Sequence, residues 1–209
     1  DLYDMHLYPG GAWRIHMLRM MLGDDVFWPA VTAYIERHAG GVVETDDFRR
    51  VLEERSGRSL ARFFDDYLFT AGFPELDVTF AYDVGKARGT FEVRQRQVEK
   101  GTTFAFPLEV AFVIDGVEHT RTLDVNAARA TLVVPMTADP ERIAIDPDLK
   151  TLARVTFDPG EPRSRRSLRE GRTISERIFA GRALVASGRR VDTRALVDAY
   201  RVEQESGVR

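Results

Sequence analysis

The chain has 209 residues, of which 44% are hydrophobic and 30% are charged, and its formal net charge is −3. This balance is typical of a globular protein, and the small negative charge provides no field that would attract nucleic acid or an anionic membrane. The sequence contains no cysteine, which excludes disulfides, thiol nucleophiles and thiolate metal sites. No apolar run is long enough to span a bilayer.

The first region, to about Phe73, has the periodicity of helices. A nearly all-apolar stretch over 12–22 predicts a largely buried helix, ended by a glycine. A third helix is expected to be capped by Thr45, with two aspartates in its first turn. The side chains expected to face inward on the second, third and fourth helices are Phe27, Val31, Tyr34 and Ile35, then Phe48, Val51 and Leu52, then Leu60, Phe63, Phe64, Tyr67 and Leu68.

From about Glu75 to Asp158 the hydrophobic period changes from 3.6 to 2, as half-buried strands require. The first such strand has Leu76, Val78, Phe80 and Tyr82 on one face. Further strands are predicted around 91–93, 108–114, 123–125, 132–134 and 143–145. Short strands separated by Gly, Asp and Pro turns favour an antiparallel sandwich over a parallel α/β sheet.

The third region opens with "DPGEPRSRRSLREGR" (158–172), which is interpreted as a polar connector. Two helical patterns follow, one with Ile174, Ile178, Phe179, Ala183 and Leu184 and one with Leu196, Val197 and Tyr200. A lone helix pair cannot bury its apolar face, so this pair is typical of the first unit of a stacked helical array. Both ends of the chain are then expected to expose apolar surface, which makes self-association one expected interaction.

The histidines form no metal motif. They are His6, His16, His38 and His119. None belongs to an H-E-x-x-H pair and no two are spaced i, i+4, so this chain offers no zinc site of that type. His16 on an apolar helix and His38 at a helix end are interpreted as structural residues. There is also no G-x-S-x-G elbow and no glycine-rich phosphate loop.

Other polar clusters suggest little chemistry. Asp65 and Asp66 are adjacent on a helix and point to different faces, so they do not make a catalytic carboxylate pair. Five arginines within 163–172 are compatible with phosphate binding, but without interleaved aromatics a solvated linker is favoured. Tyr3 and Tyr8 precede a Gly-Gly pair, and on chemistry alone they are interpreted as packing residues.

A family resemblance adds to this interpretation. The tract from "LYPGGAWRIHMLRMMLGDD" to "FFDDYLFTAGFPELDVTF" (7–80) resembles the last part of the catalytic domain of aminopeptidase N-like zinc metallopeptidases, the gluzincin aminopeptidases. The positions that match the family's motifs in order are Tyr8, Gly11, Ala12, Met17, Leu18, Leu22, Gly23, Thr45, Asp46, Asp47, Phe48, Phe63, Phe64, Leu68, Gly72 and Pro74. The "FPLEV" strand (106–110) is similar to the family's sandwich domain, and 174–200 to the opening of its helical-repeat domain.

The resemblance implies an α+β multidomain fold. Residues 1–74 would form the C-terminal helical part of a thermolysin-like catalytic domain, 75–158 an antiparallel β-sandwich, and 159–209 a linker and the first helix pair of a helical-repeat domain. The zinc-binding H-E-x-x-H helix and its distal Glu would lie upstream of Asp1. The chain is therefore expected to be an internal piece of a longer protein. The longer protein is expected to bind zinc, and this piece alone is not.

The implied activity is hydrolysis of N-terminal residues from peptides by zinc-activated water, with the piece alone inactive. Tyr8 matches the family's tyrosine that donates its phenolic hydrogen to the oxyanion, and a phenol stays protonated at neutral pH. Tyr3 matches a second active-site tyrosine less regularly. The family's usual residues between the Tyr and the Gly are replaced by Pro9 and Gly10, which leaves the geometry of this loop open.

Two alternatives remain open. A non-catalytic binding or scaffolding subunit of the same lineage would look nearly the same, and the upstream zinc motif would discriminate between the two. A carbohydrate-binding sandwich fits less well, because it leaves the helical opening unexplained and the strands show no row of exposed aromatics. The sequence leaves the localisation undetermined, with a cytoplasmic protein favoured over a secreted one.

Overall fold

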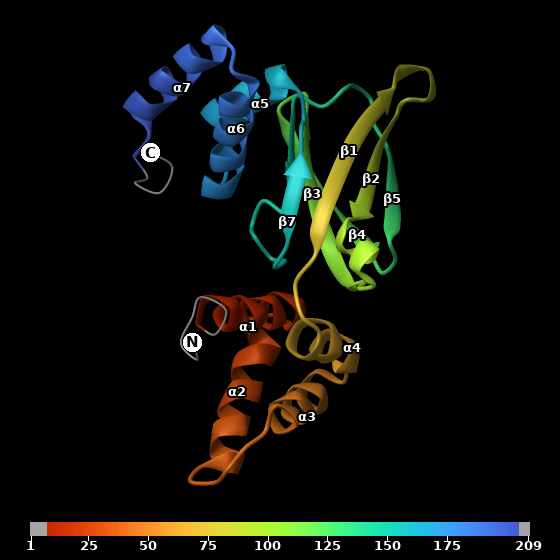
Figure 1. Cartoon of the computed structure of the whole chain (residues 1–209), viewed down its shortest axis with the longest axis vertical. Helices are drawn as coiled ribbons and strands as arrows, with labels where there is room; N and C mark the ends of the chain where they lie inside the picture. Colours follow the sequence, from red (N-terminus) through yellow and green to blue (C-terminus); the bar gives the residue numbers. More distant parts are fainter. Residues whose placement is uncertain (1–7, 205–209) are drawn as a thin grey trace. The chain divides into compact units, whose positions relative to one another are not determined.

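The computed structural model describes residues 8–204 (Figure 1). The chain forms two compact units, one ending at Phe73 and one beginning at Pro74. The first unit is made of helices, and the second combines two sheets with further helices. This confirms the predicted α+β class. Among the residues described, no helix is both long and apolar enough to cross a bilayer.

The first unit contains the helices expected from its periodicity. They are α1 (Tyr8–Leu22), α2 (Asp24–His38), α3 (Thr45–Ser56) and α4 (Ala61–Phe64), and α4 continues as a π-helical turn over Asp65–Phe69. Their predicted inner residues Phe27, Val51, Leu52, Phe64 and Tyr67 are all buried. A shared apolar core therefore holds these helices together.

Some positions differ from the prediction. Helix α1 begins at Tyr8, not at residue 12, and buries only Met17 and Leu18, so the expectation that it is largely buried is wrong. Ile35 of α2 is 60% exposed, because the small residues of that helix line its inner face. Leu68 is 38% exposed, because the wider π-helical turn shifts the phase of the residues that follow α4.

The start of α3 also differs in detail. Thr45 is the first residue of the helix, and Glu44 before it is the N-cap. The Glu44 backbone N–H donates to Asp47 Oδ2 at 2.9 Å, and Asp47 N–H in turn donates to the Glu44 side chain. Two backbone donors that an isolated helix start would leave unpaired are thereby satisfied.

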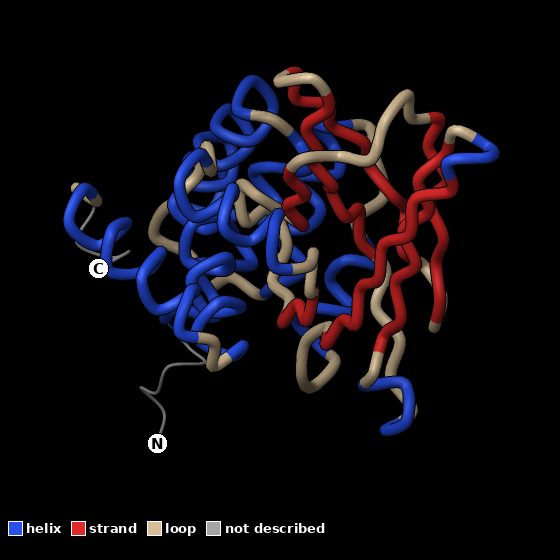
Figure 2. The backbone as a smooth tube through the Cα atoms, turned by 90° about the horizontal axis from the view of Figure 1, so that it is seen from above, coloured by secondary structure: helices blue, strands red, loops and turns tan. Residues whose placement is uncertain are grey.

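The second unit contains two sheets, whose strands are red in Figure 2. The strands are β1 (Glu75–Asp83), β2 (Arg88–Gln95), β3 (Phe106–Ile114), β4 (Val117–Val125), β5 (Arg129–Pro135), β6 (Arg142–Ile145) and β7 (Arg154–Phe157). The first sheet has the order β5-β2-β1-β7 and the second the order β4-β3-β6. The rings of Phe91 and Phe112, one from each sheet, lie 6.3 Å apart between centroids, so the sheets share a core.

Strand β7 was not predicted, and it makes the first sheet mixed. It pairs in parallel with β1, from Glu75 opposite Arg154 to Val78 opposite Phe157. The expectation of purely antiparallel pairing is therefore wrong at this one pair, whereas the other pairs are antiparallel. A strand of four residues carries too few alternations to be recognised, and its partner lies far away in the sequence.

Gly89 of β2 lies where two side chains approach the backbone. A Cβ atom at this position would come within 2.4 Å of Met136 Sδ and 2.7 Å of Phe80 Cε2. Since both side chains have to move, we expect Gly89→Ala to lower the free energy of unfolding by about 1–3 kcal/mol. Gly85→Ala is the matched control, because its Cβ would meet only Asp83 Oδ1, at 3.4 Å. Equal urea midpoints for the two variants, measured by circular dichroism, would contradict this prediction.

Three helices follow the sheets, where a polar connector and a helix pair were predicted. They are α5 (Glu161–Glu170), α6 (Ile174–Ser187) and α7 (Arg190–Val202). The expected linker is therefore wrong: its Leu168 packs with Ala180 and Leu184 of α6 and with Leu196 and Ala199 of α7. Helix α5 therefore covers apolar residues of α6 and α7 that a helix pair alone would leave exposed. Phe179, Val197 and Tyr200 are nevertheless 43%, 44% and 58% exposed, and self-association through them stays a prediction.

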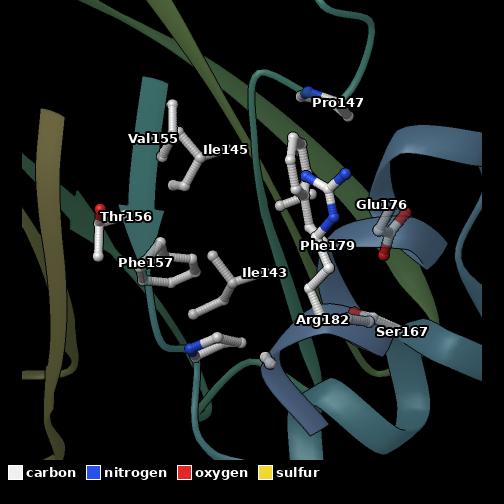
Figure 3. A pocket seen from close by; sticks show the side chains of 14 residues that line it. Ile143, Ile145, Pro147, Val155, Thr156, Phe157, Ser167, Glu176, Phe179 and Arg182 are labelled. Carbon is white, nitrogen blue, oxygen red and sulfur yellow. The ribbon is translucent and has the colours of Figure 1, made fainter. Parts of the chain in front are cut away.

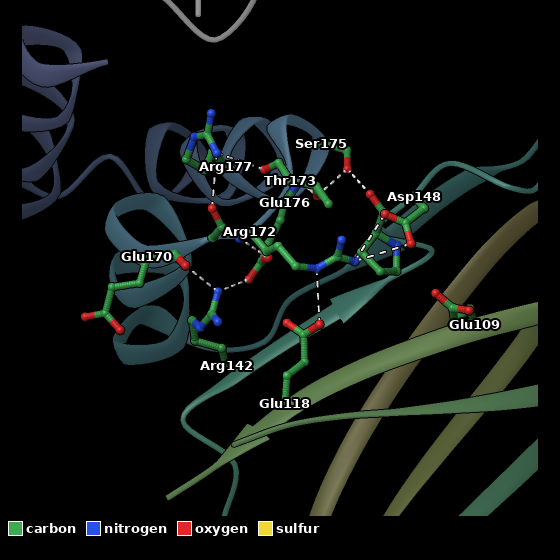
Figure 4. Close-up of polar contacts among 12 residues, drawn as sticks. Glu109, Glu118, Arg142, Asp148, Glu170, Arg172, Thr173, Ser175, Glu176 and Arg177 are labelled. Atoms are coloured by element: carbon green, nitrogen blue, oxygen red, sulfur yellow. Dashed lines mark hydrogen bonds and ion pairs between the residues drawn. The ribbon is translucent and has the colours of Figure 1, made fainter. Parts of the chain in front are cut away.

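Four of the five arginines within 163–172 pair with acidic residues, so this segment is not the solvated linker that the sequence favours. Arg163 pairs with Asp139 at 2.5 Å, and Arg166 pairs with a glutamate before β6 at 2.9 Å. Arg172 bridges Glu118 of β4 and Asp148, each at 3.1 Å (Figure 4). These side chains therefore attach the helices to the strands and loops of the same unit.

Candidate functional site

Tyr8 is the first residue of α1, and its side chain is 65% exposed. The phenol is therefore accessible to solvent in this chain. Pro9 occupies the next position, where a helix needs no backbone N–H, and its fixed φ suits a first turn. Gly10 and Gly11 complete the turn. The segment whose geometry the sequence leaves open is therefore helical.

Arg14 holds this first turn. Its Nη1 donates to the carbonyl oxygen of Gly10 at 2.9 Å, and its Nε donates to the carbonyl oxygen of Tyr67 in the π-helical turn. Burial lowers the pKa of Arg14, and the neighbouring Tyr67 offsets part of this effect. The guanidinium still stays charged, as arginine does in proteins. Sequence reasoning missed this residue; its only signal was a charge four positions after a glycine on an apolar helix.

The other end of α1 is held in a similar way. Arg58, which follows α3, donates from Nη1 to the carbonyl oxygen of Met21 at 3.0 Å. Arg19 forms a bidentate pair with Asp24 at the start of α2, with distances of 2.5 and 2.8 Å. A hydrogen bond from Arg19 lowers the pKa of Asp24. Helix α1 is thus held at both ends, and the exposed Tyr8 side chain belongs to its first turn.

The remaining candidates are not brought together. Tyr3 lies outside the described residues. Asp65 is exposed whereas Asp66 is buried and pairs with Arg62 at 2.8 Å, so the two carboxylates face different ways, as expected. Among residues 8–204, no three His, Cys, Asp or Glu side chains lie close enough to hold a metal ion. The described residues therefore do not fit a zinc site.

Two of the histidines, His38 and His119, pack against aromatic rings. His38 packs on Tyr34, with ring centroids 5.1 Å apart. His119 of β4 is half-buried and stacks on Phe112, with ring centroids 5.4 Å apart. They lie on different elements.

The second unit has a cavity of 310 Å³ that sequence reasoning did not anticipate. Figure 3 shows Ile143, Val155 and Phe157 from the strands on one side and Phe179 and Glu176 from the helices on the other. The lining is mostly apolar, and the Glu176 carboxylate is already paired with an arginine at 2.9 Å. The cavity therefore offers no free acid or base for catalysis.

Comparison with known proteins supports the resemblance found in the sequence. Residues 1–67 match the Peptidase family M1 domain. Over 121 residues, 55% of this chain, the sequence is 30% identical to Aminopeptidase N of Escherichia coli (strain K12), of which the match covers 13%. Over 83 residues, 40% of this chain, it is 35% identical to Aminopeptidase N of Caulobacter vibrioides, of which the match covers 10%. The resemblance to aminopeptidase N-like peptidases is therefore confirmed.

The fold has a counterpart among solved structures. The crystal structure of Legionella pneumophila aminopeptidase A in complex with aspartic acid superposes with a TM-score of 0.77 over 99% of this chain, at 17% identity. The match covers 24% of that protein. At this identity the likeness shows the fold alone. The chain thus spans about a quarter or less of the length of the proteins it resembles.

Proposed function

We propose that this chain is part of a zinc-dependent aminopeptidase that removes N-terminal residues from peptides, and that Tyr8 belongs to its catalytic machinery. The observation that carries the proposal is the match of residues 1–67 to the Peptidase family M1 domain. The exposed position of Tyr8 at the start of α1 adds support. In this proposal 1–74 end the catalytic domain, 75–158 form a sandwich scaffold, and 159–209 begin a helical-repeat domain.

The proposed role of Tyr8 follows from the chemistry of peptide hydrolysis. Attack of water on the scissile carbonyl turns the carbonyl oxygen into an oxyanion. The Tyr8 hydroxyl donates a hydrogen bond to this oxygen, and the bond strengthens as negative charge develops. A neutral donor needs no proton transfer for this task and is fixed before the reaction, which is what makes such stabilisation effective.

The metal is not supplied by the described residues, since they hold no cluster that fits zinc. In the proposed enzyme the zinc ligands and the general base lie in other parts of the protein. When bound, zinc would polarise the substrate and activate water. The part of the reaction assigned to residues 8–204 is the hydrogen bond from Tyr8.

The proposal is tested by comparing the full-length protein with the 209-residue chain. We expect the full-length protein to bind zinc and to release the product of an aminoacyl anilide steadily. The chain alone, folded by circular dichroism, should retain no stoichiometric zinc after dialysis and should release no product. Steady hydrolysis or stoichiometric zinc in the chain alone would refute the proposal that the zinc ligands and the general base lie in other parts of the protein. A folded full-length protein without activity would instead favour the non-catalytic binding subunit.

A further inference from the structure

The guanidinium of Arg14 connects two helix ends in the first unit. It donates to the Gly10 carbonyl in the first turn of α1 and to the Tyr67 carbonyl in the π-helical turn that ends at Phe69. Arg14 and Tyr67 are 53 positions apart in the sequence. One side chain therefore links the turn that carries Tyr8 to the end of a different helix.

Each of these hydrogen bonds has a physical reason. The last carbonyls of a helix lack an N–H partner within the helix, and Tyr67 lies in the last turn before Phe69. A cation at this end also interacts favourably with the helix dipole. Helical side chains point back toward the N-terminus, which brings Arg14 to the carbonyl one turn earlier, that of Gly10. The planar guanidinium fixes both carbonyls in one geometry.

The first turn of α1 needs such a restraint. Gly10 and Gly11 have the widest backbone freedom of any residue, and glycine inside a helix is less stabilising than alanine. At the end of a helix this turn would fray without an external bond. Since Tyr8 opens the same turn, its backbone position depends on how firmly the turn is held.

We infer that Arg14 is a positioning residue for Tyr8, acting through the carbonyl groups of Gly10 and Tyr67. This inference rests on the catalytic role proposed for Tyr8. Arg14 does not itself contact the substrate in this scheme. Because a misplacement of about 1 Å in a catalytic group can lower the rate about a hundred-fold, losing the restraint should lower kcat and leave substrate binding largely intact.

The test is a double-mutant cycle in the full-length protein. Arg14→Met keeps the length and apolar stem of the side chain and removes both donors. We expect it to lower kcat by about ten- to a hundred-fold, with KM changed little. In the Tyr8→Phe background the same substitution should cost almost nothing further, because the group that it positions is already gone. Arg14→Lys, which keeps one flexible donor, should recover part of the loss.

Two further measurements separate positioning from general stability. Arg19→Met is the matched control on the same helix, since Arg19 pairs with Asp24 and makes no bond to the first turn; it should leave kcat unchanged. Amide hydrogen exchange at Ala12 and Trp13, whose N–H groups bond the carbonyls of the first turn in an α-helix, should speed up in Arg14→Met. It should stay unchanged in Arg19→Met.

The outcomes that overturn the inference are distinct from those that overturn the proposed function. A normal kcat in Arg14→Met, or losses that simply add in the double variant, would refute the positioning role while Tyr8 stays catalytic. A normal kcat in Tyr8→Phe would refute the catalytic role, and the positioning role with it. If Arg14→Met does not fold, the same cycle is run with Arg14→Lys, and additive losses then refute the inference.

Discussion

Replacing Tyr8 with phenylalanine in the full-length protein is expected to lower kcat by about a hundred- to a thousand-fold. Removing one donor to an oxyanion in other hydrolases costs about 2.7–4 kcal/mol in transition-state stabilisation. The hydrogen bond forms mainly as charge develops, so KM should change little. The substitution removes only a hydroxyl from a ring that is 65% exposed, so the fold should be unaffected.

The control for this experiment lies in the same unit. Tyr34 of α2 packs its ring against Phe48, with centroids 5.0 Å apart. Tyr34→Phe removes the same hydroxyl away from the start of α1 and is expected to leave kcat unchanged. Zinc content and thermal midpoint should match the parent protein in both variants. A Tyr8→Phe protein that binds zinc and keeps most of its kcat would rule out the assignment and leave Tyr8 as a packing residue.

The helices of the first unit could be predicted because their apolar residues repeat every three or four positions. Val51, Phe64 and Tyr67 are buried as this spacing requires. The same rule failed at Ile35 and Leu68. Periodicity identifies one face of a regular helix, but it does not show where alanines let a neighbouring helix approach, or where a π-helical turn changes the spacing.

Strand β7 and helix α5 could not be predicted because their stability depends on distant partners. Strand β7 pairs with β1, and strands β2 to β6 lie between the two in the sequence. Helix α5 is highly polar, but its Ser164, Ser167 and Leu168 are buried, and Leu168 packs with residues of α6 and α7. Its Arg166 pairs with Glu141 just before β6, and Arg172 just after the helix pairs with Glu118 of β4, which local charge alone does not predict.

The candidate site, too, could be predicted only in part from the sequence. Tyr8 was found through a family resemblance, since nothing in its local chemistry separates it from a packing tyrosine. Arg14 was not found, because its role depends on the Tyr67 carbonyl, which only the folded chain brings near. What the sequence shows is the type of residue available; which groups it meets depends on tertiary structure.

The buried pair of Arg142 and Glu176 supports the second prediction of large effect, which concerns stability. Their side chains are only 12% and 6% exposed, and Arg142 Nη1 lies 2.9 Å from Glu176 Oε1 (Figure 4). Arg142 Nη1 also donates to the Glu170 carbonyl at 2.7 Å, and Glu176 Oε2 accepts from the Arg172 N–H at 2.9 Å. The pair therefore joins strand β6 to the end of α5 and the start of α6.

Glu176→Ala is expected to lower the free energy of unfolding by about 3–5 kcal/mol. Removing one member of a buried pair leaves the other charge without compensation in a poorly hydrated site. The Arg172 N–H also loses its acceptor. The double variant Arg142→Met, Glu176→Leu should be more stable than Glu176→Ala, because an apolar pair of similar size carries no buried charge.

The stability of these variants has to be measured with a signal that reports on the second unit. Both tryptophans, Trp13 and Trp28, lie in the first unit, so their fluorescence does not report directly on β6 or α6. Hydrogen exchange of the peptides that cover these two elements, recorded across a urea series, gives the stability of the unit itself. Glu170→Ala is the control: it breaks only the exposed pair with Arg166 and should barely shift the exchange midpoint. Equal shifts for Glu176→Ala and Glu170→Ala would show that the buried pair does not hold the helices on the sheet.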